Sequence, residues 1–196
     1  MGRTGKLFIL SGPAGIGKTT AANALLANAA ASNLQRSVTA TTRHPRQGES
    51  NENHYHFISK DKFLEWIGSG IFLEYAVVHG NYYGSLKSDV LEKISRGMDV
   101  ILIIDVQGFL QIMEKHLNIE IVSIFFKPKS LEILEERMRG RSTESDAEIA
   151  RRINASKDEI SFANRYKYVI VSESREHDFN EILRIYMKEK NENNGR

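Results

Sequence analysis

The 196-residue chain contains no cysteine, which excludes disulfide bonds and thiolate metal sites. It has only 3 prolines and no Pro-, Gly- or Ser-rich linker, so we expect a single domain. Lys and Arg total 27 against 25 Asp and Glu, a balance that argues against a nucleic-acid or membrane-surface partner. With neither a membrane-length apolar run nor a signal-peptide core, we expect a soluble, cytoplasmic protein.

A glycine-rich segment near the N-terminus matches the phosphate-binding pattern G-x-x-x-x-G-K-[ST]. Its residues are Gly12, Pro13, Ala14, Gly15, Ile16, Gly17, Lys18 and Thr19. Residues 7–10 before it predict a buried strand, and the Ala- and Leu-rich residues 19–31 after it predict a helix. At such a turn, backbone N–H groups surround phosphate oxygens and the lysine reaches the β- and γ-phosphates. We therefore expect a nucleoside triphosphate here, the alternative being a chance glycine-rich turn before an ordinary helix.

Short β-branched segments alternate with helical segments along the rest of the chain. The predicted strands are residues 37–40, 100–104, 119–126 and 168–171. Strands that alternate with helices indicate an α/β fold with a parallel sheet covered by helices. Capping pairs predict that one helix starts at Ser145, with Glu148, and that the last starts at Asp178, with Glu181.

Residues 43–86 interrupt this alternation. Two short strand-like pieces, 54–57 and 72–75, flank a predicted helix at about 61–67. The segment therefore predicts a small subdomain inserted into the α/β core.

Motifs along nearly the whole chain resemble, in order and spacing, those of guanylate kinases. They lie at residues 41–49, 54–57, 72–76, 80–85, 104–108, 137–141, 149–152 and 168–171. The resemblance implies one P-loop kinase domain with a core (1–42, 87–136, 164–190), a GMP-binding insert (43–86) and a helical lid (137–163). It also implies the reaction ATP + GMP ⇌ ADP + GDP, with Mg²⁺ as the cofactor.

The resemblance further implies a set of acceptor-binding residues. They are Thr39, Arg43, Arg46, Tyr55, Glu74, Tyr83, Ser85 and Asp105. The chemistry agrees, because planar guanidinium groups grip a dianionic phosphate and a carboxylate suits the N1–H and amino donors of guanine. For Tyr55, core packing is the competing interpretation.

On the donor side, the resemblance places Arg137 beside the adenine of ATP and adds Thr20 to the nucleotide-binding loop. It places Arg141 and Arg152 in a mobile lid that brings positive charge to the transferred phosphoryl group, as catalytic partners of Lys18 and Arg43. The alternative is that such arginines are ordinary solvated helix residues. Mg²⁺ would be held by Thr19, with Asp105 acting indirectly.

The chain departs from the family pattern at two places. Ile103 stands where an acidic residue is common, and Val171-Ser172-Glu173 replaces the usual Val-Asn-Asp. Two other functions stay open at this point. One is a non-catalytic guanylate-kinase-like module that binds phosphorylated partners, and the other is a related P-loop kinase of a different small molecule.

Overall fold

The computed structural model of the chain describes residues 4–45, 55–78, 80–140 and 145–192. The chain forms two compact units. The first comprises Met1–Leu7 and Gln35–Ile121, and the second comprises Phe8–Leu34 and Val122–Arg196. In the part of the chain described, no helix is both long enough and apolar enough to cross a membrane.

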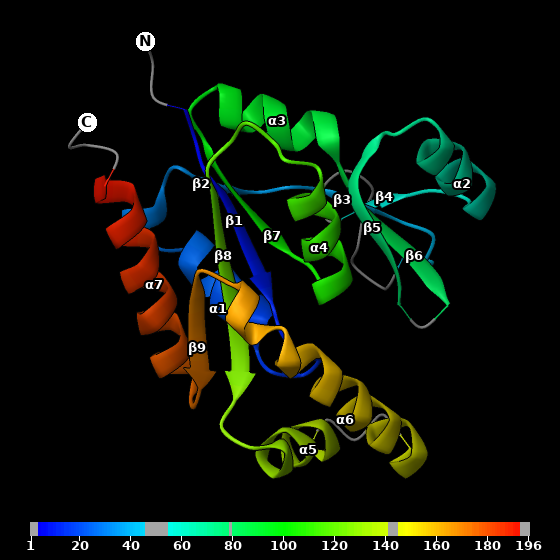
Figure 1. The fold of residues 1–196 in the computed structure, drawn as a ribbon, viewed down its shortest axis with the longest axis vertical. Coiled ribbons are helices and arrows are strands. Elements are labelled where there is room, and N and C mark those ends of the chain that lie inside the picture. Colours follow the sequence, from blue (N-terminus) through cyan, green and yellow to red (C-terminus); the bar gives the residue numbers. More distant parts are fainter. Residues whose placement is uncertain (1–3, 46–54, 79, 141–144, 193–196) are drawn as a thin grey trace. The chain divides into compact units, whose positions relative to one another are not determined.

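The strands form two sheets, labelled in Figure 1. The larger has the order β2-β7-β1-β8-β9, with bounds Leu34–Arg36, Asp99–Ile103, Leu7–Ser11, Ile121–Pro128 and Tyr168–Ser172. The smaller has the order β4-β3-β6-β5, with bounds Tyr55–Phe57, Thr39–Thr41, Asn81–Leu86 and Phe72–Val78. Strands β8 and β9 are parallel. Together with the alternation of strands and helices, this confirms the predicted α/β fold.

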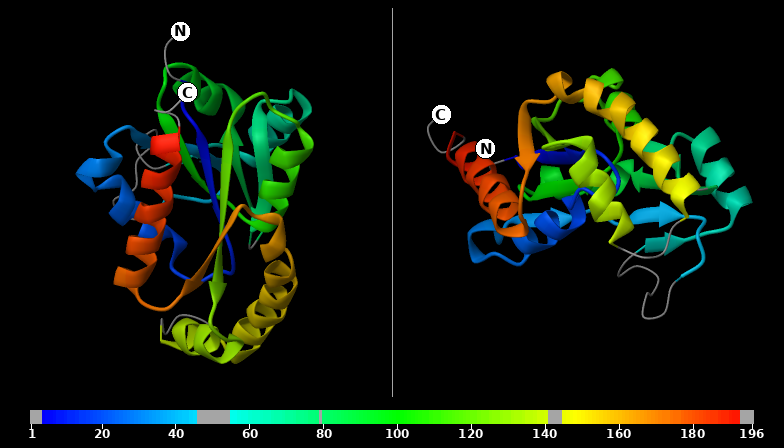
Figure 2. Two further views of the ribbon diagram at one scale, coloured as in Figure 1. Left: turned by 60° about the vertical axis from the view of Figure 1, so that its left-hand side comes forward. Right: turned by 90° about the horizontal axis from the view of Figure 1, so that it is seen from below.

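Helices α1 (Lys18–Leu26), α4 (Val106–Glu114), α5 (Leu131–Arg139) and α7 (Arg175–Glu192) each follow a strand of the larger sheet. The other helices are α2 (Lys60–Gly68), α3 (Lys87–Ser95) and α6 (Asp146–Ser161), with 3₁₀ turns at Ala29–Ala31 and Ala163–Arg165. In the second unit α7 packs against β9 and α1, as Figure 2 shows. Helix α6 starts as predicted, because the Ser145 hydroxyl accepts the Glu148 N–H at 3.3 Å.

Three local predictions were wrong in detail. Helix α7 begins at Arg175, and the cap is Ser174, whose hydroxyl accepts the N–H of His177 at 3.1 Å. Helix α1 ends at Leu26, and Asn28 caps a separate 3₁₀ turn through Ala30. The predicted strand at 37–40 is found only from Thr39 onward, because residues 37 and 38 connect β2 of the larger sheet to β3 of the smaller one.

In the first unit, helix α2 covers one face of the smaller sheet. Phe63 on α2 is fully buried and stacks on Phe72 of β5, with ring centroids 4.3 Å apart. Ala40 belongs to the same cluster, and Trp66 and Tyr82 pack against it. Because side chains alternate between the faces of a strand, the polar residues of these strands point to the opposite face.

Candidate active site

The glycine-rich loop of the second unit joins β1 to α1. Gly12, Gly15 and Gly17 have φ values of +136°, +83° and +112°, in the region that side chains other than glycine rarely adopt. A Cβ at Gly12 would lie 2.3 Å from the carbonyl oxygen of Phe126, which belongs to β8. Helix α1 begins with no acidic residue in its first turn, so its N-terminus favours an anion. The loop geometry matches the predicted phosphate site.

The Lys18 side chain folds back over this loop. Its Nζ donates hydrogen bonds to the carbonyl oxygens of Gly12 and, at 2.9 Å, of Pro13. Thr19 and Thr20, which follow it in the first turn of α1, are exposed. A phosphate oxygen is a stronger acceptor for an ammonium group than a neutral carbonyl, so a bound phosphate can take over these hydrogen bonds.

A cavity of about 440 Å³ lies beside the loop. Its lining residues are Gly15, Ile16, Gly17, Thr20, Ala21, Arg137, Gly140, Ser174, Arg175 and Asp178. Five of these, Ala21, Gly140, Ser174, Arg175 and Asp178, were not among the site residues predicted from the sequence. The sequence predicted a helix start among the last three but contained no motif for a ligand there.

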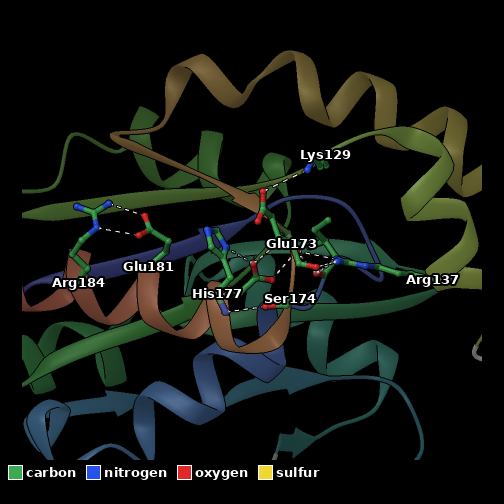
Figure 3. Close-up of polar contacts among 10 residues, drawn as sticks. Lys129, Arg137, Glu173, Ser174, His177, Glu181 and Arg184 are labelled. Carbon is green, nitrogen blue, oxygen red and sulfur yellow. Dashed lines mark hydrogen bonds and ion pairs between the residues drawn. The ribbon is translucent and has the colours of Figure 1, made fainter.

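Arg137 is held by three oxygens at one end of this cavity, in the region drawn in Figure 3. Its guanidinium donates to the Ser172 hydroxyl at 2.9 Å and to the Glu173 carbonyl at 2.6 Å. A third, longer contact of 3.4 Å reaches the carbonyl of Ile16 in the glycine-rich loop. These bonds fix the plane of the guanidinium against the loop, so Arg137 offers a rigid wall to a ligand in the cavity.

Ser172 stands where the family pattern has an amide, and the structure shows what it does. Its side chain is buried, and its hydroxyl donates to the Asp178 carboxylate at 2.6 Å while it accepts from Arg137. Asp178 also accepts the Glu173 N–H at 3.2 Å. Ser172 is therefore engaged in holding Arg137, and it is not among the residues that line the cavity.

The arginine predicted for the lid on α6 is part of an ion-pair cluster. Arg152 lies 3.3 Å from Glu148, and Arg151 lies 2.8 Å from the same carboxylate oxygen. Hydrogen bonding to Arg151, and then to Arg152, lowers the pKa of Glu148 to about 2. Arg141, the other predicted lid arginine, lies outside the described residues.

A second cavity, of about 210 Å³, belongs to the first unit. It is lined by Arg36, Thr39, Tyr55, Glu74, Ala76, Val78, Tyr83, Ile103, Ile104 and Asp105. The strand register explains this grouping, because Thr39 is opposite both Tyr55 and Ser85, and Ser85 is opposite Glu74. The sheet thus places the predicted acceptor residues of β4, β3, β6 and β5 in one row across one face.

Glu74 is the buried carboxylate of this cavity, with 4 % of its surface exposed. One of its oxygens accepts two hydrogen bonds from Ser85, from the hydroxyl at 2.6 Å and from the backbone N–H at 3.1 Å. Burial raises the pKa of Glu74 to about 7, and the nearby charge of Asp105 adds to the effect. The Ser85 bonds oppose this shift by stabilising the ionised form.

Helix α4 brings the second carboxylate to the cavity. Asp105 is its N-cap, and one carboxylate oxygen accepts the Gly108 N–H at 2.8 Å. A Cβ on Gly108 would lie 2.5 Å from the other carboxylate oxygen of Glu74. The absence of a side chain at position 108 therefore lets the helix approach Glu74 closely. Gly108 belongs to the motif at residues 104–108, but the sequence alone did not indicate that the helix needs a glycine there to approach Glu74.

Arg43, Tyr55 and Tyr83 cluster near the cavity. The Arg43 guanidinium lies 5.5 Å from the centre of the Tyr55 ring and 5.8 Å from that of Phe57. The rings of Tyr55 and Tyr83 are 6.3 Å apart in an edge-to-face arrangement. Both tyrosines are half-buried, in keeping with a cavity wall rather than with the apolar core. Arg46 lies outside the described residues.

Arg36 is a further cationic residue of this cavity that the sequence analysis missed. It ends β2, outside every motif that carried the resemblance, so no local pattern marked it. Ile103, the position that departs from the family pattern, lines the same cavity and is half-buried. Its side chain is therefore available to a ligand and is not enclosed in the apolar packing of the sheet.

Comparisons with known proteins identify the family of the chain. The sequence model of the guanylate kinase family matches residues 4–189. A guanylate kinase of Clostridium tetani is 41% identical over 95% of this chain and 87% of the relative, and one of Neisseria gonorrhoeae is 43% identical over 93% and 87%. The crystal structure of guanylate kinase from Anaplasma phagocytophilum superposes with a TM-score of 0.75 at 33% identity, covering 95% of this chain and 87% of that one. The chain therefore belongs to the guanylate kinase family.

Proposed function

We propose that the protein transfers the γ-phosphoryl group of ATP to GMP, giving ADP and GDP. The observation that carries this proposal is the buried Glu74 beside Asp105 in the cavity of the first unit. Guanine offers an N1–H and an exocyclic amino group on one edge, whereas adenine offers a bare ring nitrogen at the corresponding position. Two carboxylates are acceptors, so they match guanine and leave adenine unsatisfied.

The remaining acceptor residues have roles that follow from their chemistry. Thr39 and Ser85 supply hydroxyl groups, of which the first faces the cavity and can donate to O6 of guanine. Arg43, Tyr55 and Tyr83 would bind the phosphate of GMP through a guanidinium fork and two phenolic hydroxyls. Arg46 is assigned to the same phosphate by its place in the family motif.

For the donor, we propose that ATP places its phosphates on the glycine-rich loop and its adenine in the cavity beside Arg137. Lys18 would stabilise the charge that develops on the transferred group, because phosphoryl transfer depends on positioning and charge neutralisation more than on covalent catalysis. Arg141 and Arg152 would complete this neutralisation from the lid. The acceptor is itself a phosphate oxygen, so no side chain need act as a strong general base.

The residues present suit Mg²⁺ bound together with the nucleotide. In the ranges that the structure describes, no three His, Cys, Asp or Glu side chains group as a metal site. Mg²⁺ commonly takes only one or two protein ligands when phosphates and water supply the rest, and the exposed Thr19 hydroxyl meets that need. The ion would neutralise phosphate charge. Asp105, whose carboxylate already caps α4, would act through water.

The direct test is a coupled assay of ADP formation with GMP, AMP, CMP and UMP. We expect turnover with GMP and, for AMP, a kcat/KM lower by at least about 10²-fold, because the buried acceptors would stay unpaired. Equal use of AMP and GMP would refute the assignment of the base. The absence of turnover with every nucleotide would favour a non-catalytic binding module, although the intact loop argues against it. A cytoplasmic location, where both nucleotides are available, is part of the proposal.

A further inference from the structure

Two residues of α4 contact β5, and the N-cap of the helix lies three residues before the first of them. Asp105 caps the helix, Gly108 lies against the Glu74 carboxylate, and Gln111 reaches the backbone of Tyr75. Positions i, i+3 and i+6 of a helix lie along one side of it, so these contacts form a single row. The row meets two consecutive residues of β5, of which one is the buried Glu74.

Gln111 binds both backbone groups of Tyr75. Its amide Nε2 donates to the Tyr75 carbonyl at 2.8 Å, and its Oε1 accepts the Tyr75 N–H at 3.1 Å. Strand β5 is at the edge of the smaller sheet, and Tyr75 pairs with Gly84 of β6 on its other side. The glutamine amide thus takes the place of a neighbouring strand at this one residue, and it ties β5 to α4.

The strand needs such an anchor because it is irregular just before this point. The pairing of β5 with β6 shifts register between Phe72 and Glu74. A bulge of this kind leaves one residue unpaired and changes the direction in which the next side chain points. The direction of Glu74 is therefore set by its contacts, which are Ser85 on β6, Gly108 on α4 and, one residue further along, the Gln111 clamp.

We infer that Gln111 is a positioning residue for guanine recognition: by clamping Tyr75 to α4, it fixes the spacing between the carboxylates of Glu74 and Asp105. The inference rests on the proposed role of Glu74 in base binding. Asp105 caps the same helix that carries Gln111. The position of α4 against β5 therefore sets the distance between the Glu74 and Asp105 carboxylates. Neither Gln111 nor Tyr75 lines the cavity, so the effect is transmitted through the backbone.

The two hydrogen bonds of Gln111 to Tyr75 affect the position of β5 more than the free energy of unfolding. The Tyr75 backbone groups lie at an exposed strand edge, where water can replace the glutamine amide. A hydrogen bond exchanged for one to water changes stability little. A displacement of a binding group by a fraction of an ångström, in contrast, weakens an oriented interaction strongly.

The test compares Gln111→Met with Gln107→Met, a control on the same helix at an exposed position. Methionine keeps the size of glutamine and removes both hydrogen bonds. We expect Gln111→Met to raise KM for GMP about tenfold and to leave KM for ATP within about twofold of the unchanged protein. The control should alter neither constant.

The selective readout is the ratio of kcat/KM for GMP to that for IMP, which lacks the exocyclic amino group. Gln111→Met should lower this ratio, because Glu74 and Asp105 no longer converge on the amino group. An unchanged ratio, or a fall in melting temperature with GMP and IMP affected equally, would overturn the inference. Gln111→Glu replaces the Nε2 donor with a carboxylate oxygen that repels the Tyr75 carbonyl, so it should also lower the ratio and provides a second test.

Glu74→Gln in the same assays separates the base-binding role of Glu74 from the positioning role of Gln111. If Glu74→Gln leaves the GMP to IMP ratio unchanged, the proposed role of Glu74 is wrong. If that variant lowers the ratio and neither Gln111 variant does, only the positioning role of Gln111 is wrong.

Discussion

In the second unit the proposed phosphate site is built from backbone, whereas in the first unit the proposed acceptor cavity is built from side chains. The loop from Gly12 to Thr19 is one continuous segment between β1 and α1, and its shape depends on positive φ angles. The acceptor cavity draws on β2, β3, β4, β5, β6, the end of β7 and the N-cap of α4. On the proposed assignment, a local backbone site binds the phosphates that all nucleotides share, and a side-chain site assembled from several strands distinguishes one base.

The largest effect should come from Lys18, the charged side chain of the backbone site. Lys18→Ala should lower kcat about 10²- to 10³-fold, because the charge on the transferred phosphoryl group loses a preorganised partner. The melting temperature should stay within a few degrees, since the hydrogen bonds of its Nζ to the Gly12 and Pro13 carbonyls lie within the loop itself. Lys62→Ala, at an exposed position on α2, is the control, and normal turnover by Lys18→Ala would contradict the proposed mechanism.

Glu74→Gln should impair the acceptor cavity of the first unit. We expect kcat/KM for GMP to fall about 10²-fold, because one acceptor of the base edge becomes a donor, while KM for ATP changes little. The same variant should be more stable than the unchanged protein at pH 8. A comparable loss of ATP binding would show that the two sites are not separable in this way.

The stability effect follows from the pKa of Glu74, which burial raises from 4.5 to about 7. A carboxyl group with a raised pKa in the folded protein opposes folding once it ionises. The penalty is absent below pH 4.5, grows between pH 4.5 and 7, and reaches about 3 kcal/mol above pH 7. The free energies of unfolding of the unchanged protein and of Glu74→Gln, measured at pH 5 and pH 8, give this penalty. If the difference between the two proteins does not grow with pH, the pKa of Glu74 is not raised.

The same ionisation makes GMP binding depend on pH. Protonated Glu74 cannot accept both guanine donors, so KM for GMP should rise about tenfold between pH 8 and pH 6. KM for ATP in the same range serves as the internal control. Because the GMP phosphate also titrates near pH 6, Glu74→Gln must be measured in parallel, and an equal rise in that variant would assign the effect to the phosphate.

Gly108→Ala gives a smaller and more local effect. The added methyl group would lie 2.5 Å from a Glu74 oxygen, the movable end of a side chain, so Glu74 must turn away. We expect kcat/KM for GMP to fall about fivefold, with an unfolding free energy lower by no more than about 1 kcal/mol. Gly68→Ala is the control, because no atom lies within 4 Å of that Cβ. Unchanged GMP kinetics would mean that the close approach of α4 is not needed.

The smallest effect should come from Ile103→Glu, which restores the acidic residue common in the family. Residue 103 lies at the half-buried end of β7 and lines the acceptor cavity. A further carboxylate acting on Mg²⁺ through water should lower the Mg²⁺ concentration for half-maximal rate about threefold. A Mg²⁺ titration of both proteins, with melting curves, tests this prediction. If Ile103→Glu folds and its Mg²⁺ concentration for half-maximal rate is unchanged, the prediction is wrong.

The sequence predicted those parts of the protein that depend on neighbours along the chain. The glycine-rich loop, the cap of α6 and most strands follow from local periodicity and capping, and the structure confirms them. The family resemblance predicted five of the side chains that line the acceptor cavity, Thr39, Tyr55, Glu74, Tyr83 and Asp105, and missed Arg36. That prediction came from the order of the motifs along the chain. The strand register, which explains why these side chains lie together, is visible only in the structure.

Tertiary structure alone decided how those residues behave. The bulge before Glu74, the Gln111 clamp on Tyr75 and the hydrogen bond from Arg137 to Ser172 all join residues that are distant in sequence or facing across strands. The raised pKa of Glu74 has the same origin, because desolvation depends on everything packed around a group. Local sequence determines backbone preference at each position, whereas pairing register and burial are properties of the folded chain as a whole.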